Sequence, residues 1–352
     1  MLQKEGPAQK TCSKPESLQS LDLSTAQEER SAAEHYARAL ELQSRGNGEG
    51  AEKEFQAALA ERPMKEKYVR GLTLFYIARS RYEEAVKVIR DYVKLCGVTP
   101  LGYELEGELL FKGKQYDLAY EAARQSLALS GNNARMHELL GLIYIVRRQE
   151  GAAVLELEKA AEQDPDNPEM RYYCGRALYS AGRVSEGRDQ FLVCLKIRPD
   201  FPKANENLGL CYEGLGETTK AIAAYRKEME VDKAHGSAKN AEPYAFYGRL
   251  LLDHDQPEEA ASVLRQGVTV NPNSFAANYE LGRALFQLGT LQEAEHYLVT
   301  AKNLDPKYAR TYYVLGRLHQ KQNKSGEATR DFEIFQQLRK QGEDRGFPLP
   351  NR

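Results

Sequence analysis

The amino-acid sequence predicts an all-α fold, an α-solenoid of nine consecutive helix pairs. Small residues recur with a period of 34 residues, and the apolar residues between them keep a helical spacing. No segment alternates between polar and apolar residues as a β-strand does. Counted from Gly175, the period meets Ala39, Thr73, Gly107, Gly141, Gly209, Gly248, Gly282 and Gly316, with one interval of 39 residues before Gly248.

A second column of small residues lies twelve positions beyond these anchors. Small side chains in both columns let two helix backbones approach closely, which a branched side chain would prevent. A third column, twenty-four positions beyond the anchors, is mostly proline or glycine and is expected to end the second helix of each pair. The second column reads Ala51, Ala85, Ala119, Ala153, Gly187, Ala221, Ala260, Ala294 and Ala328.

The period also predicts the order of the segments along the chain. Residues 1–31 are rich in Lys, Gln, Ser and Pro and are expected to form a disordered arm. A polar insertion around residues 234–240 is expected to lengthen the loop between repeats six and seven, as a passive loop or as a hinge. Repeats are expected to begin near residues 32, 66, 100, 134, 168, 202, 241, 275 and 309, so that the array covers residues 32–342 and residues 343–352 form a tail.

The last repeat ends in an apolar surface that contains Phe332, Phe335 and Leu338. Gly342 to Arg352 contains glycine and proline, so no further helix is predicted there to cover this surface. The ends of solenoids normally need a polar cap. Either Phe347 and Leu349 of the tail fold back onto this end, or the end is a contact surface.

The repeat resembles the tetratricopeptide repeat. Small residues at the eighth and twentieth positions, a bulky residue at the twenty-fourth and proline at the thirty-second match that family, and residues 278–285 (NYELGRAL) with 291–298 (LQEAEHYL) form one good copy. The resemblance covers residues 32–342 and implies a right-handed superhelix whose first helices line a concave face. The family's aromatic residue at the fourth position is usually missing here, as at Arg171, Asn205 and Asn278.

The resemblance implies that partners contact the second, fifth, ninth and twelfth positions of each first helix. In repeats three and four these columns hold mainly acids, and in repeats five to nine they hold tyrosine and arginine. Such a row suits a partner segment that bears carboxylates, because arginine binds a carboxylate through two parallel N–H groups. The alternative is that these arginines brace neighbouring helices through acids such as Glu280 or Glu242, or are solvated. The candidate residues are Tyr172, Arg176, Arg249, Tyr279, Arg283, Arg310, Tyr313 and Arg317.

No motif in the sequence indicates catalysis, a metal or a cofactor. The glycines of residues 46–50 follow no predicted strand and lack the lysine of a phosphate-binding loop. The five cysteines form no CxxC pair, and the six histidines are dispersed. Cys174 and Cys194 occupy core positions and are expected to be inert thiols. We therefore predict that the chain is not an enzyme and carries neither cofactor nor metal.

Composition narrows the class of partner. The chain is 41% hydrophobic and 28% charged with a net charge of −2, so nothing suggests bulk attraction to nucleic acid or acidic membranes, and no stretch is long and apolar enough to span a membrane. An odd number of scattered cysteines and an N-terminus without an apolar run favour a cytoplasmic location. Oligomeric state stays open.

The function predicted from these observations is that of an interaction scaffold, which binds a protein or peptide segment in the concave groove. The alternative is an accessory or regulatory arm of an enzyme complex, which binds a small molecule or presents substrate to a catalytic partner. The absence of catalytic motifs favours the first.

Overall fold

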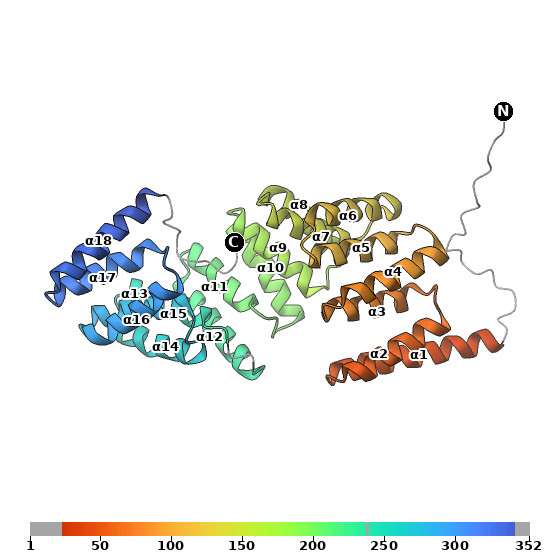
Figure 1. Cartoon of the computed structure of the whole chain (residues 1–352), viewed down its shortest axis with the longest axis horizontal. Helices are drawn as coiled ribbons and strands as arrows, with labels where there is room; N and C mark the ends of the chain where they lie inside the picture. Colours follow the sequence, from red (N-terminus) through yellow and green to blue (C-terminus); the bar gives the residue numbers. More distant parts are fainter. Residues whose placement is uncertain (1–22, 237–238, 342–352) are drawn as a thin grey trace, which may run out of the picture. The chain divides into compact units, whose positions relative to one another are not determined.

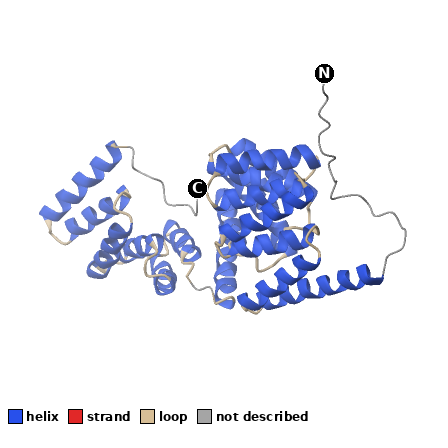
Figure 2. Ribbon diagram, turned by 45° about the vertical axis from the view of Figure 1, so that its right-hand side comes forward, coloured by secondary structure: helices blue, strands red, loops and turns tan. Residues whose placement is uncertain are grey.

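The computed structural model describes residues 23–236 and 239–341, and their secondary structure is helical throughout (Figure 2). Eighteen helices form nine antiparallel pairs in these residues (Figure 1). Each pair packs on the next along the chain within its unit, so the predicted all-α solenoid class is confirmed. None of the described helices is long and apolar enough to cross a membrane.

The chain divides into two compact units, residues 1–165 and residues 166–352. The first unit contains α1 (Leu23–Ser44), α2 (Gly48–Glu61), α3 (Glu66–Ala78), α4 (Tyr82–Cys96), α5 (Pro100–Lys112), α6 (Tyr116–Ser130), α7 (Ala134–Val146) and α8 (Glu150–Gln163). The second contains α9 (Pro168–Ser180), α10 (Val184–Ile197), α11 (Ala204–Gly214), α12 (Thr218–Ala234), α13 (Glu242–Asp253), α14 (Pro257–Val270), α15 (Phe275–Gln287), α16 (Leu291–Leu304), α17 (Ala309–Lys321) and α18 (Ser325–Lys340).

The first helix begins earlier than expected. Helix α1 starts at Leu23, so residues 23–31, which the sequence assigned to a disordered arm, are helical. These residues lack an apolar stripe, but polar contacts attach them to the following helices: Ser31 Oγ donates to Glu61 Oε1 at 2.9 Å, and Lys65 Nζ donates to Glu29 Oε1 at 3.1 Å. Residues 1–22 and 342–352, which include most of the predicted arm and all of the tail, lie outside the described residues.

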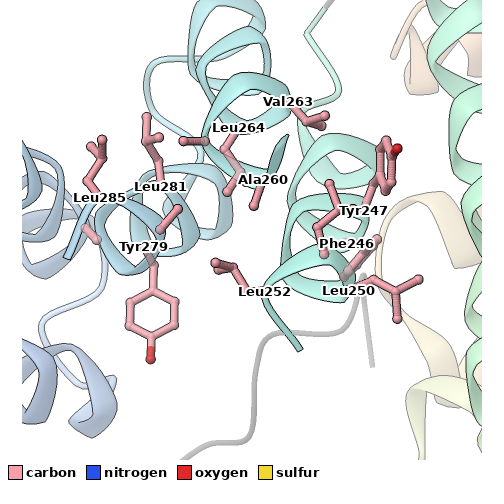
Figure 3. Packing of buried hydrophobic residues seen from close by; sticks show 14 of the residues in the cluster. Phe246, Tyr247, Leu250, Leu252, Ala260, Val263, Leu264, Tyr279, Leu281 and Leu285 are labelled. Atoms are coloured by element: carbon pink, nitrogen blue, oxygen red, sulfur yellow. The ribbon is translucent and has the colours of Figure 1, made fainter. Parts of the chain in front are cut away.

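All of the anchor glycines except Gly107 face the bulky residue of their own second helix. A Cβ atom placed on Gly141 would lie 2.4 Å from Leu157 Cγ, and one on Gly282 would lie 2.5 Å from Leu298 Cγ. Real Cβ contacts are never this short, so glycine at the anchor is what allows the two helices to pack. Figure 3 shows the core built this way in the second unit, around Leu264 and Leu281.

Polar pairs replace the missing aromatic residue at the fourth position of several repeats. His35 Nδ1 lies 2.6 Å from Glu54 Oε2, and His137 Nδ1 lies 2.6 Å from Glu156 Oε2. Arg171 Nη1 makes the equivalent contact in repeat five, donating to the amide oxygen of Gln190 at 3.1 Å. All three contacts join residues 19 positions apart, so a hydrogen bond between the two helices takes the place of an aromatic contact.

Helix α11 begins two residues later than its position in the period predicts. Its N-cap, Lys203, has a φ of 63° and makes no side-chain capping bond. The buried carboxylate of Glu228 on α12 caps the helix instead, accepting from the backbone N–H groups of Lys203 (2.6 Å), Asn205 (3.1 Å) and Glu206 (3.3 Å). A neighbouring helix therefore satisfies the free N–H groups at this helix start.

Candidate functional site

The two acids that repeat three places in these columns have partners inside the first unit. Glu104 is buried and accepts hydrogen bonds from Arg70 Nη2 and Asn133 Nδ2, both at 3.0 Å. Burial alone would raise the pKa of Glu104, but the hydrogen bonds and the charge of Arg70 hold this pKa below its usual value. Glu108 accepts from Arg135 Nη1 at 3.2 Å. Because these partners lie on neighbouring helices, Glu104 and Glu108 contribute less free negative charge to this face than the sequence predicts.

Two of the candidate arginines of the second unit have carboxylate partners of their own. Arg249 Nη2 donates to Glu213 Oε2 at 2.6 Å, and Arg283 Nη1 donates to Glu280 Oε2 at 2.6 Å. Both arginine side chains are about three-quarters covered, and the side chain of Glu280 is fully buried. Burial raises the pKa of Glu280 to about 7 against the opposing charge of Arg283. For these two arginines the geometry is that of the bracing alternative.

Two of the candidate tyrosines are buried. Tyr172 is 7% exposed and Tyr279 is 4% exposed, and burial raises the pKa of Tyr172 to about 12. In each case the arginine one turn later lies beside the ring, with a distance of 5.9 Å from its guanidinium carbon to the ring centroid. Those arginines, Arg176 and Arg283, are half-buried. Phenol groups this deeply covered support the surface rather than form it.

The remaining candidates lie together on α17 and are exposed. Arg310, Tyr313 and Arg317 occupy one helix face at spacings of three and four residues, and Lys321 continues the same face. Arg317 Nη1 donates to Tyr313 Oη at 3.3 Å, and Lys321 Nζ lies 4.4 Å from the centroid of the Phe286 ring. Helix α17 contains no acid, and none of the ion pairs among the described residues includes one of its three cations. We call these four residues the α17 stripe.

The fifth position of a repeat contacts the residue that closes the same repeat. Tyr172 packs on Phe201 with ring centroids 5.0 Å apart, and Tyr279 packs on Tyr308 with centroids 5.2 Å apart. Where the fifth position is glutamate, an asparagine closes the repeat: the Glu104–Asn133 contact described above recurs as Asn240 Nδ2 donating to Glu206 Oε2 at 3.1 Å. The closing residue therefore covers part of the fifth side chain in these repeats.

Sequence reasoning missed two groups of residues that shape this site. Lys321 is the thirteenth residue of its repeat and lies one position beyond the four columns that the family resemblance implies. Phe201 and Tyr308 follow their tyrosines by the same 29 residues, which is a visible signal, but they lie just before the next repeat and not on a first helix. A search for aromatic residues at the closing position would have found them.

Other features of the described residues are less informative for function. A cleft of about 330 Å³ lies among α2, α3 and α4, with an apolar floor that includes Leu72 and Val88. Two of its charged lining residues pair with each other, with Arg81 Nη1 donating to Glu52 Oε2 at 2.5 Å. No group of three or more potential metal ligands was found in the described part of the chain. Burial raises the pKa values of Cys194 and Cys211 to about 12, which keeps these thiols unreactive near neutral pH.

Comparison with known families places the repeats. Sequence patterns of the tetratricopeptide repeat match residues 36–97, 105–168 and 248–309, and a second pattern of the same description matches residues 147–231. Together these matches cover well over half of the chain.

Individual relatives are distant and longer. The chain is 26% identical to tetratricopeptide repeat protein 37 of Xenopus laevis over 67% of this chain and 15% of that protein. It is 25% identical to the BBSome complex member bbs-4 of Caenorhabditis elegans over 60% of this chain and 47% of that protein. The chain thus spans less than half of the length of these relatives.

Solved structures support the fold alone. The crystal structure of the APC/C hetero-tetramer Cut9–Hcn1 aligns over 77% of this chain and 52% of its own, with a TM-score of 0.61 and 11% identity. The structure of PilF from Pseudomonas aeruginosa aligns over 60% of this chain and 94% of its own, with a TM-score of 0.51 and 20% identity.

Proposed function

We propose that this chain, which belongs to the tetratricopeptide repeat family, is a non-enzymatic scaffold that binds a segment of a partner protein on the first helices of its second unit. Proteins of this family generally mediate protein–protein interactions, and two similar proteins are named as members of complexes. The observation that carries the proposal is the α17 stripe, an exposed row of cations with a tyrosine and without acids.

The stripe is a better contact surface than the neighbouring first helices. On α13 and α15 the arginines are engaged by Glu213 and Glu280, so a partner would have to displace a carboxylate that is already in place. On α17 the cations are exposed, and no such exchange is needed. We therefore expect Arg310, Tyr313 and Arg317 to contact the partner, Arg176 to lie at its margin, and Tyr172, Arg249, Tyr279 and Arg283 to support the surface.

Site-specific photocrosslinking in cells tests this proposal. A photoreactive amino acid at Gln320, on α17, should crosslink a partner, whereas the same group at the exposed Glu333 of α18 serves as the matched control. Adding the charge reversals Arg310→Glu and Arg317→Glu should abolish the crosslink from residue 320, because the partner carries carboxylates. Equal crosslinking from both helices, or a crosslink that survives the reversals, would contradict the proposal. Thermal stabilisation by small molecules but by no peptide would instead favour an accessory arm of an enzyme complex.

A further inference from the structure

Repeats five and eight cover their fifth-position tyrosine with an aromatic ring. In repeat five Phe201 is itself buried and lies against Tyr172, and in repeat eight Tyr308 is buried and lies against Tyr279. In the latter pair the two rings are inclined at 82°, the edge-to-face arrangement that aromatic pairs favour. An aromatic neighbour at this place is therefore part of how these two repeats are completed.

Repeat nine has the same tyrosine without the cover. The ring centroids of Tyr313 and Phe332 are 6.1 Å apart, and those of Tyr172 and Phe191 are 5.9 Å apart. The two tyrosine rings therefore occupy equivalent positions in their own repeats. Tyr313 is nevertheless 42% exposed, and no described residue takes the place of Phe201. The half-buried ring of Phe335 lies beside Tyr313, with a distance of 5.3 Å between the two ring centroids.

Arginine side chains lie on both sides of the exposed Tyr313 ring. Arg317 donates to the Tyr313 hydroxyl, and Arg310 lies on the same helix face on the other side. Seven residues of helix separate the two arginines, a rise of about 10 Å. An extended peptide rises about 3.3 Å per residue, so about three residues of a bound segment would span that distance.

We propose that a partner completes repeat nine: an aromatic side chain of the bound segment stacks on Tyr313 and Phe335, and carboxylates on either side of it pair with Arg310 and Arg317. The inference rests on the proposed function and specifies the partner as an acidic segment with a central aromatic residue. The aromatic side chain takes the place that Phe201 and Tyr308 hold in their repeats. The carboxylates neutralise cations that pair with no acid in the part of the chain that the structure describes.

Fluorescence anisotropy with the full chain tests the inference. The probe is a labelled peptide with one phenylalanine between two aspartates that lie three residues apart. Replacing its phenylalanine by leucine, or its aspartates by asparagine, should each weaken binding about tenfold, because each removes a specific contact. In the protein, Arg317→Ser should have a similar effect, whereas Arg330→Ser, at an exposed arginine of α18, should have none.

The outcomes separate this inference from the proposed function. Tight binding that requires the aromatic ring, the carboxylates and Arg317 supports it. Crosslinking from α17 without binding of the peptide leaves the scaffold in place and overturns the aromatic closure. Phe347 lies outside the described residues and offers another aromatic ring, so Phe347→Ser is measured in parallel. Binding of the peptide to that variant alone would overturn the inference and assign the place on Tyr313 to the chain's own tail.

Discussion

Repeats five and nine have the same tyrosine and arginine at the fifth and ninth positions of their first helices, yet expose them differently. Tyr172 is 7% exposed and Tyr313 is 42% exposed. Each ring meets the bulky residue of its own second helix at nearly the same distance, so the difference arises outside the helix pair. Phe201, the residue that closes repeat five, and Asn207 of the following helix, which donates to the Tyr172 hydroxyl at 3.4 Å, cover Tyr172 from outside that pair. A residue's position within the repeat therefore does not by itself make it a binding residue.

The largest effect is expected from removing the cover in repeat five. Phe201→Ala should lower the free energy of unfolding by about 3 kcal/mol, because it leaves a cavity against Tyr172 in a buried cluster. Urea denaturation followed by circular dichroism measures this. If Phe201→Ala unfolds at the urea midpoint of the wild-type protein, the closing residue does not hold the repeat together.

Arg283 and Arg317 should differ in how much they contribute to stability, as Tyr172 and Tyr313 differ in exposure. Arg283→Met should destabilise the second unit by about 2–3 kcal/mol at pH 8, because Glu280 is left buried and charged without its partner. Arg317→Met, the matched change on α17, should leave the urea midpoint unchanged, since no carboxylate of the described residues pairs with Arg317. Equal losses in the two variants would show that the α17 cations also brace the fold.

Two of the glutamates at fifth positions, Glu206 and Glu104, should respond to pH with opposite signs. Burial raises the pKa of Glu206 to about 7, above its value in the unfolded chain, so the folded state gains stability as pH falls through 7 and loses it as pH rises. Glu104 has a lowered pKa, so its contribution is present near neutral pH and is lost in acid, as pH falls through the folded-state pKa.

Hydrogen exchange in the two units at pH 5.5 and 8.5 separates these contributions. Glu206→Gln should remove about 2 kcal/mol of the stability that the second unit loses between these pH values, because roughly 1.5 pH units of this interval lie below the folded-state pKa of Glu206, at about 1.4 kcal/mol each. Glu104→Gln serves as the comparison in the first unit and should not reproduce that change. A pH profile of the second unit that is the same with and without Glu206 would contradict the assignment.

The smallest effect on stability is expected from removing the exposed ring of Tyr313. Tyr313→Ala should cost less than about 1 kcal/mol, because much of its side chain is in solvent. The same change should weaken binding of the aromatic peptide, measured by anisotropy. A loss of stability as large as that of Phe201→Ala would mean that Tyr313 belongs to the core.

Much of the fold was predictable because it depends on local spacing. The starts of α3, α5, α7, α9, α15 and α17 coincide with the predicted repeat starts, since the glycine anchors and proline column act within one helix pair. The early start of α1 was not predicted, because its first residues have polar contacts in place of an apolar stripe. The late start of α11 was missed for a similar reason, since its cap, Glu228, lies on another helix.

The sequence by itself determined the period, the helix pairs and the list of tyrosines and arginines on the first helices. Only the tertiary structure decided which of these side chains are available. Arg249 meets Glu213, and Tyr172 meets Phe201, across 36 and 29 residues of chain. Such contacts form only when consecutive pairs stack, because helical periodicity places side chains on a face but does not select what lies opposite them. As a result of this packing, α17 has both an exposed tyrosine and arginines that form no ion pair in the described residues. No other first helix of the second unit combines these two features there.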